Sequence, residues 1–165
     1  MLATVVPGCG FVDLYAGTGA VGLEARSRGA ARVTWVEKAP RSLRCLEANL
    51  AAFLGPAPFP AGFALARADA LAWLRRPTVP RGSVSVVFAD PPYVEHEGDA
   101  DGTAALLEAA AASGMLAERA FFAVEQRAGT PPPEAPEWEG VALRRYGRTQ
   151  IALLRRVQGA TTGVL

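Results

Sequence analysis

Strand-like and helix-like segments alternate along this sequence, which predicts an α/β protein built on a mostly parallel sheet. Short apolar and β-branched runs are separated by amphipathic stretches of helix length, and such chains place helices on both faces of the sheet. The run at 83–89 is almost wholly apolar, as is typical of a central strand covered on both sides. Two adjacent runs at 141–146 and 149–156 predict a C-terminal antiparallel hairpin. The expected sheet therefore has seven strands.

Local signals define the remaining elements. Pro40 suits a first helical turn, and Gly55-Pro56 ends the helix that follows it. Besides the hairpin and 83–89, the expected strands are 11–15, 32–37, 63–68 and 120–125, and the expected helices are 20–27, 40–54, 71–75 and 104–113. Loops are expected at 94–102, which carries four acids, and at the proline-rich 129–136, with a loose tail at 157–165.

Length and composition predict a single globular domain over 1–165. Half of the residues are hydrophobic and a fifth are charged, as in globular proteins. No apolar stretch approaches the ~20 residues of a membrane helix, and no signal peptide opens the chain. We therefore expect a cytoplasmic protein with no membrane partner. Cys9 and Cys45 lack metal-site spacing and His96 lies alone in an acidic loop, so no metal site is expected.

A glycine turn between the first expected strand and helix is the first functional signal. Gly17, Gly19 and Gly22 fit G-x-G-x-x-G, and Glu37 follows 20 residues after Gly17, which taken literally is a dinucleotide fingerprint. Asp13, four residues before Gly17, would repel a pyrophosphate and attract a cation. The two acids suit a ligand with an amino group, a ribose and no phosphate, such as S-adenosylmethionine. A plain strand–helix turn is the alternative.

Acids recur where the expected strands end. Asp13, Glu37, Asp69 and Asp90 each lie at the carboxyl end of a strand, and ligands of open α/β sheets bind at that edge. Unpaired acids gathered on one edge repel one another, which argues against a purely structural role. We expect this edge to be the site.

The sharpest motif is Asp90-Pro91-Pro92-Tyr93, directly after the central strand. The two prolines fix two φ angles and hold an acid, a backbone carbonyl and an aromatic ring in a rigid arc. Asp90 and the Pro91 carbonyl can accept both protons of an exocyclic amino group on a nucleobase. Tyr93 can stack on that base once it is flipped out. The motif predicts methyl transfer to such an amino group, the alternative being a proline-stiffened strand exit with a core tyrosine.

The charge distribution is compatible with a nucleic-acid partner without requiring one. Net charge is +1, so the whole molecule is not polycationic. Two groups of arginines stand out: Arg67, Arg75, Arg76 and Arg81, and the acid-free C-terminal set Arg144, Arg145, Arg148, Arg155 and Arg156. Such clusters can contact phosphates, and solvated arginines explain them equally well.

Several motifs together resemble a known family. They are DLYAGTGAVGLEARSRGA at 13–30, VEK at 36–38, Asn49, Asp69-Ala70, DPPY at 90–93, Glu125 and RRYGRT at 144–149. Over about 10–156 the sequence resembles the class I S-adenosylmethionine-dependent methyltransferases, and among them the RsmD family of bacterial 16S rRNA (guanine-N2)-methyltransferases. The resemblance implies a Rossmann-like fold, and we expect a monomer. It implies methylation of guanine N2 in 16S rRNA, free or within a small-subunit assembly particle.

The resemblance also implies roles for individual residues. Asp13, Ala16, Gly17 and Gly19 would surround the methionine moiety, and Glu37, with Lys38 beside it, would bind the ribose. Asp69 and the Ala70 amide would meet the adenine, although Asp69 serves equally as the N-cap of the next helix. Asp90, Pro91 and Tyr93 would hold the base, with Asp90 also beside the cofactor. Glu125 and Tyr146-Gly147 match family positions without a derivable role.

One departure from the family concerns the start of the chain. Family members carry a basic segment with an Arg-Pro-Thr/Ser motif before the first strand, whereas here residues 1–9 would be only its stub. We therefore expect cofactor binding but poor RNA methylation by the chain as written. The rival functions are N-methylation of another planar group, such as DNA adenine or protein glutamine, and a non-catalytic NAD-binding domain.

Overall fold

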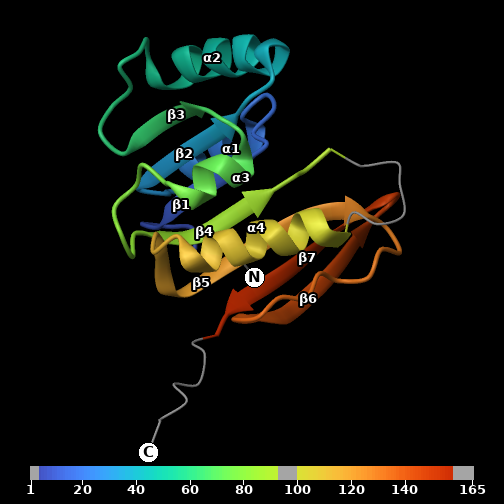
Figure 1. The fold of residues 1–165 in the computed structure, drawn as a ribbon. Coiled ribbons are helices and arrows are strands. Elements are labelled where there is room, and N and C mark those ends of the chain that lie inside the picture. The colour runs from blue at the N-terminus through green and yellow to red at the C-terminus, as the bar shows by residue number, and fades with distance from the viewer. Residues whose placement is uncertain (1–3, 93–99, 158–165) are drawn as a thin grey trace, which may run out of the picture.

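The computed structural model describes residues 4–92 and 100–157 and contains one seven-stranded sheet (Figure 1). The strands are β1 (Gly10–Leu14), β2 (Arg32–Glu37), β3 (Phe63–Arg67), β4 (Val84–Ala89), β5 (Leu116–Arg127), β6 (Trp138–Tyr146) and β7 (Thr149–Arg156). The helices are α1 (Ala20–Ser27), α2 (Pro40–Leu54), α3 (Ala70–Arg75) and α4 (Ala100–Ala112). The strand order is β3-β2-β1-β4-β5-β7-β6.

The sheet is parallel except at its C-terminal side, as predicted. β1 to β5 run parallel to one another, while β7 pairs antiparallel with both β5 and β6. The order in which strands are added to the sheet reverses between β1 and β4. β2 and β3 extend the sheet on one side of β1, and the later strands extend it on the other. The carboxyl ends of β1, β2 and β4 therefore meet where ligands bind in such sheets.

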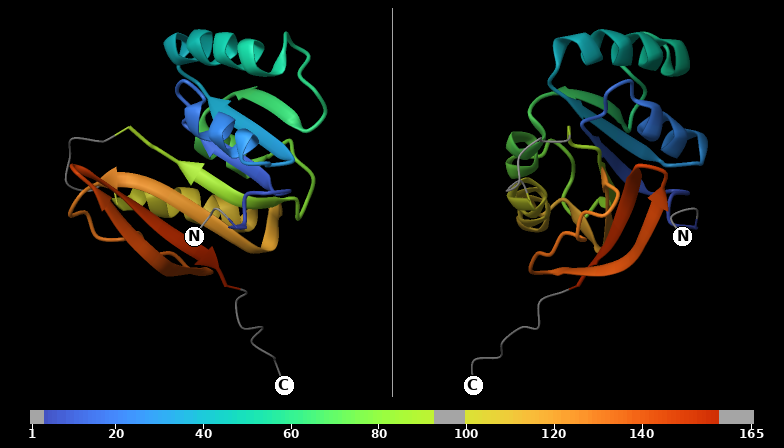
Figure 2. Two further views of the ribbon diagram at one scale, coloured as in Figure 1. Left: turned by 180° about the vertical axis from the view of Figure 1, so that it is seen from behind. Right: turned by 90° about the vertical axis from the view of Figure 1, so that its right-hand side faces the viewer.

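Helices cover both faces of the sheet. α3 and α4 lie on the face turned toward the viewer in Figure 1, and α1 lies on the opposite face, seen in the left view of Figure 2. Each face has its own core. Trp73 and Leu107 from α3 and α4 pack with Val12 and Val87, whereas Leu46 and Leu50 from α2 pack with Trp35. Burial of these apolar side chains supplies the main favourable term in folding.

Hydrogen bonds of the Gln150 amide and the Trp138 indole stabilise the antiparallel part of the sheet. Gln150 is 3% exposed, accepts a hydrogen bond from the Gly129 amide and donates to the Thr130 carbonyl. It thereby satisfies backbone groups of the proline-rich connection between β5 and β6. Trp138 donates from Nε1 to the Leu107 carbonyl at 3.0 Å and meets Phe122 edge to face. These contacts dock β6 and its connection against α4.

Three element boundaries differ from the sequence-based expectation by three residues or more. β5 begins at Leu116 rather than at 120, because Leu116 is buried and pairs with Val84 before an irregularity in the register. β6 begins at the buried Trp138 rather than at 141, although Gly140 lies beside a second irregularity. α4 begins at Ala100, so residues 100–102 of the expected acidic loop are helical. The rest of that loop and most of the expected tail lie outside the described residues.

Candidate functional site

Four neighbouring strands each carry an acid at or near their carboxyl ends, at the same edge of the sheet. In spatial order the acids are Glu37 on β2, Asp13 on β1, Asp90 after β4 and Glu125 on β5. Because Leu14 is paired with Val36 and Ala89, and Ala89 with Val124, the acids on β2, β4 and β5 are level with one another. The acids form a row in which Asp13 lies two residues deeper in the sheet. The structure thus brings the predicted acids Asp13, Glu37 and Asp90 together and adds Glu125. The fourth predicted acid, Asp69, follows β3 at the same edge and is tied to the end of β2 by its ion pair with Lys38.

Glu37 organises the glycine turn from the end of β2. Its Oε2 accepts a hydrogen bond from the Gly17 amide at 2.8 Å, and its Oε1 accepts from the amides of Lys38 and Ala39 at 2.8 and 2.7 Å. The side chain is 8% exposed. A carboxylate bonded to three amides is fixed in orientation beside the turn.

Asp13 lies beneath the turn. It is 2% exposed, and its Oδ2 accepts a hydrogen bond from the Gly22 amide, one of the unpaired donors in the first turn of α1. The pKa of Asp13 is raised from 3.8 to about 7, chiefly by loss of hydration; the Gly22 amide lowers it, and the Asp90 and Glu37 carboxylates add smaller increases. Asp13 therefore orients the start of α1 and places an ionisable group under the row of acids.

The later glycines of the motif have a packing reason. A Cβ at Gly22 would come within 2.2 Å of Trp35 Nε1, and a Cβ at Gly19 within 2.4 Å of the Leu46 side chain. Trp35 itself donates from Nε1 to the Gly19 carbonyl at 3.2 Å. At Gly17 a Cβ would meet only the Tyr15 carbonyl oxygen, at 3.9 Å, and φ is 55°, so this position needs glycine for its backbone conformation. Only Gly17 therefore faces free space.

Asn49 pins the turn from α2. Its Nδ2 donates to the Thr18 carbonyl at 2.9 Å. Ala16, just before Gly17, is buried and donates its amide to the Val36 carbonyl. The turn is thus held on both sides, by α2 and by β2.

Asp69 acts as the N-cap of α3, which was one of its two expected roles. Its Oδ1 accepts from the Ala72 amide at 3.1 Å, and its Oδ2 pairs with Lys38 Nζ at 2.8 Å. The Lys38 hydrogen bond is the largest cause lowering the pKa of Asp69, followed by the Ala72 amide. Ala70 is buried in the first turn of α3. Lys38 and Asp69 thus form an exposed pair beside the glycine turn.

Asp90 is exposed at the exit of β4, and Pro91 follows it half-buried. Partial loss of hydration and then the neighbouring Glu125 carboxylate raise the pKa of Asp90. The Asp90 carboxylate also raises the pKa of Asp13, so Asp90 lies close to the acid beneath the glycine turn. Tyr93, the third predicted catalytic residue, lies outside the described residues.

Sequence reasoning missed one residue of the site, Tyr15. It adopts φ 56°, a left-handed conformation that is uncommon for a residue with a side chain and often marks a functional position. Its phenol is close enough to Asp69 for that carboxylate to raise the pKa of Tyr15, after the larger effect of burial. The position of Tyr15 between Asp13 and Gly17 is the sequence signal that could have placed it in the site. The expected strand at 11–15 includes Tyr15, whereas β1 ends at Leu14.

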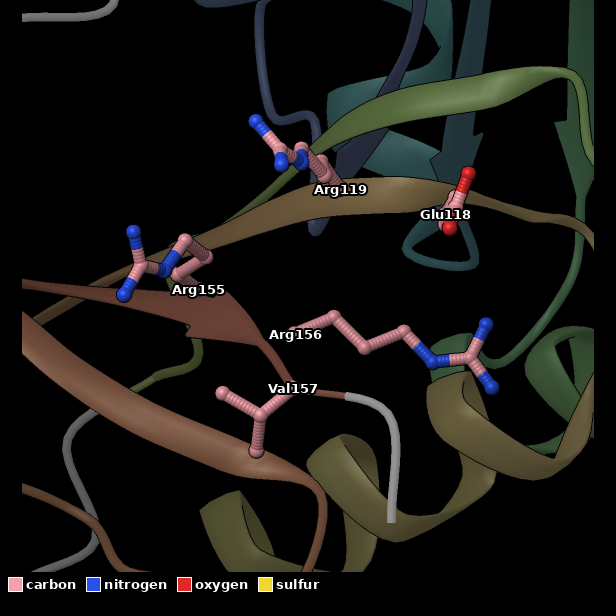
Figure 3. A pocket seen from close by; sticks show the side chains of 5 residues that line it. All are labelled: Glu118, Arg119, Arg155, Arg156 and Val157. Carbon is pink, nitrogen blue, oxygen red and sulfur yellow. The ribbon is translucent and has the colours of Figure 1, made fainter. Parts of the chain in front are cut away.

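Two hollows lie away from the row of acids. One, of about 390 Å³, is lined by Glu118, Arg119, Arg155, Arg156 and Val157, at the start of β5 and the end of β7 (Figure 3). Figure 3 shows Arg156 extending away from Arg119 and Arg155. Arg155 and Arg156 are paired with Glu139 and Glu137. The other hollow, of about 260 Å³, lies against Gly10, Arg32 and Ser83 at the beginnings of the parallel strands.

Neither metal-binding clusters nor membrane helices are found where the structure describes the chain. Within residues 4–92 and 100–157, no group of three or more His, Cys, Asp or Glu side chains could hold a metal ion. No helix in these ranges is long and apolar enough to span a bilayer. Cys9 is a buried free thiol and Cys45 an exposed one.

The strand order and the acid-flanked glycine turn define a Rossmann-like class I methyltransferase fold. The model of a family described as "Conserved hypothetical protein 95" matches residues 1–155. Ribosomal RNA small subunit methyltransferase D of Escherichia coli K12 is 34% identical over 157 residues, which cover 94% of this chain and 72% of that protein. The chain belongs to this family, the RsmD family of methyltransferases.

Solved structures agree with this assignment. The Escherichia coli protein yhhF, described as a candidate methyltransferase, superposes with a TM-score of 0.77 at 30% identity, over 95% of this chain and 82% of that one. The Haemophilus influenzae protein HI0767, described as a candidate methylase, gives the same TM-score at 22% identity, over 95% and 92%. This second likeness concerns the fold alone. The predicted fold class and family are therefore confirmed.

Proposed function

We propose that this chain transfers a methyl group from S-adenosylmethionine to the exocyclic N2 of a guanine in 16S rRNA. The observation that carries the proposal is the row of acids on β2, β1 and β4, with Asp13 buried beneath a glycine turn. This row disfavours a pyrophosphate and suits a cationic ligand with a ribose. The name of the Escherichia coli relative supplies the rRNA part of the proposal.

The residues present fit this cofactor. Gly17 and the exposed face of the turn leave room for a ligand against the main chain, and the Glu37 carboxylate matches a ribose diol. Lys38, Asp69 and the Ala70 amide flank the place proposed for the adenine, while Ala16, Gly17 and Gly19 surround the methionine end. Asp13 acts in this scheme mainly by orienting the turn. S-adenosylmethionine, when bound, supplies a methyl group already activated on a sulfonium.

The base would be held by Asp90 and the Pro91 carbonyl. Both are hydrogen-bond acceptors, so together they can accept hydrogen bonds from the two N–H groups of an amino group and direct its lone pair toward the methyl donor. Catalysis of this kind depends on positioning and electrostatics rather than on a nucleophilic side chain. Stacking of the flipped guanine on Tyr93 completes the proposed catalytic set.

The proposed substrate is 16S rRNA, free or within an assembling small subunit, and the chain would act as a monomer in the cytoplasm, where that RNA is found. Mass mapping of rRNA from a strain lacking this gene tests the proposal. One guanine should lose its N2-methyl group and regain it on complementation with the wild-type gene but not with Asp90→Ala. Unaltered rRNA modification in the deletion strain contradicts the proposal.

Ligand specificity separates this function from NAD binding. A ligand that binds only the folded state raises apparent stability, so S-adenosylhomocysteine should raise the melting temperature and NADH should not. The reverse result would favour the non-catalytic alternative.

A further inference from the structure

The antiparallel side of the sheet has a face that no described helix covers. α1 and α2 pack over the β1–β2–β3 side of this face, whereas the left view of Figure 2 shows β5, β7 and β6 without a helix in front of them. The exposed apolar side chain of Tyr146, 62% accessible, belongs to this part of the sheet.

Cross-strand pairing shows which side chains share that face. Arg127, Thr149 and Tyr146 form one row across β5, β7 and β6, and Glu125, Ile151 and Arg144 form the next. Directly paired residues point to the same face, and Ala123 and Leu153, one row further, belong to the core on the α1 side. Arg127, Arg144 and Tyr146 therefore lie together on the uncovered face.

The turn between β6 and β7 adds a further arginine. Gly147 and Arg148 connect the strands, with Gly147 at φ 61°, a glycine-first loop that matches the twist of a hairpin. Arg148 is thus presented at the tip of the hairpin and is exposed. We call Arg127, Arg144, Tyr146 and Arg148 the hairpin surface.

The arginines of the hairpin surface have no acidic partner in the described part of the chain, in contrast to Arg155 and Arg156 at the other end of β7. Arg155 pairs with Glu139, Arg156 with Glu137 and Arg67 with Glu47. Arg127, Arg144 and Arg148 are exposed and enter none of the ion pairs found between described residues. Their charge is available to an external anion.

The hairpin surface lies on the same edge of the sheet as Asp90. β4 pairs with β5, and Glu125 on β5 shares its row with Ile151 and Arg144. Three strand spacings of about 4.8 Å separate β4 from β6, or roughly 15 Å. The carboxyl end of β5 and the β6–β7 turn reach the edge where β4 ends. A strand whose base entered the site beside Asp90 would pass over the hairpin surface.

We infer that the hairpin surface binds the RNA strand that flanks the methylated guanine. Arg127, Arg144 and Arg148 contact phosphates, and Tyr146 stacks on an unpaired base. An exposed aromatic ring among arginines is suited to single-stranded RNA, whereas an acidic protein partner would use the charges without needing an open ring face. The inference rests on the proposed function and names the surface that holds its substrate.

Fluorescence anisotropy of a fluorescein-labelled RNA hairpin with guanines in its loop tests the inference, at several salt concentrations and with S-adenosylhomocysteine present. The Arg127→Ala, Arg144→Ala, Arg148→Ala triple variant should lower the slope of log affinity against log salt by about two to three units. Tyr146→Ala should weaken binding at least about fivefold, and Tyr146→Phe should retain it. Cofactor affinity, measured by calorimetry, should be unchanged in all of them.

The matched control removes the same number of charges elsewhere. Arg26, Arg32 and Arg119 are exposed and lie near the end of α1 and the starts of β2 and β5, so their triple alanine variant should change the slope by less than about one unit. Equal effects of both triple variants on the salt slope would overturn the inference. Displacement of the RNA by poly-glutamate at the same concentration of negative charge would overturn it too. If the wild-type chain binds S-adenosylhomocysteine but no RNA, the proposed substrate fails as well.

Discussion

Asp13 and Gly22 are joined by a hydrogen bond of 2.8 Å from the Gly22 amide to the Asp13 Oδ2 atom. The bond ties the buried end of β1 to the first turn of α1 and spans the glycine turn between them. Glu37 holds the same turn from the other side through the Gly17 amide. The turn is therefore shaped by two carboxylates before any ligand arrives, and each gives a separate prediction.

The first prediction concerns stability against pH. Unfolded Asp13 ionises near pH 4 and folded Asp13 near pH 7, so between these values the folded state binds more protons. The free energy of unfolding should therefore fall as pH rises from about 4 to 7, by at most about 4 kcal/mol from this group. Asp13→Asn keeps an acceptor for the Gly22 amide and should lack this fall. Urea unfolding of both proteins at pH 5 and pH 8 measures the difference, and parallel pH profiles would contradict the assignment.

The second prediction concerns Glu37. Glu37→Ala removes the expected ribose partner and releases three amides, so S-adenosylmethionine affinity should fall at least tenfold, because hydrogen bonds to charged groups contribute about 1.5–3 kcal/mol each. Titration calorimetry measures the affinity. Glu47→Ala, which removes an exposed partner of Arg67, is the control and should bind normally. Unchanged affinity in Glu37→Ala would remove this residue from the site.

The third prediction separates binding from chemistry. Asp90→Ala should abolish methyl transfer to RNA while cofactor affinity stays within a few-fold, since the main partner of Asp90 is the base. Tritium transfer from labelled S-adenosylmethionine measures turnover, and calorimetry measures binding. Wild-type turnover in Asp90→Ala would refute the proposed mechanism.

The fourth prediction tests why the motif ends in glycine. A Cβ at Gly22 would meet Trp35 at 2.2 Å, so Gly22→Ala should destabilise the protein by about 1–3 kcal/mol through overpacking. Combining Gly22→Ala with Trp35→Phe should restore part of the lost stability, because the phenyl ring is smaller than the indole. Gly102→Ala is the control, because nothing lies within 4 Å of its Cβ and the position is helical; it should stabilise the protein by about 0.4–1 kcal/mol. Thermal unfolding distinguishes the three variants.

The sequence by itself determined the fold class, because apolar runs, glycines and prolines act locally. The apolar run at β4, Pro40 at the start of α2 and the hairpin at β6–β7 were all located within a few residues. It also marked Asp13, Glu37 and Asp90 as edge residues, since an acid directly after an apolar strand needs no tertiary information to be placed there. The boundaries of β5 and β6 were missed, because the pairing of Leu116 and the burial of Trp138 depend on distant partners.

Only the tertiary structure decided what each marked residue contacts. Asp13 is bonded to the helix amide beneath the turn, and Gly19 and Gly22 are small because Leu46 and Trp35 fill the space beside them. The strand order put Glu125 next to Asp90, and ion pairing separated the engaged arginines of the C-terminal set from Arg144 and Arg148. Burial, pairing and charge balance arise between segments far apart in the chain, so no local pattern encodes them.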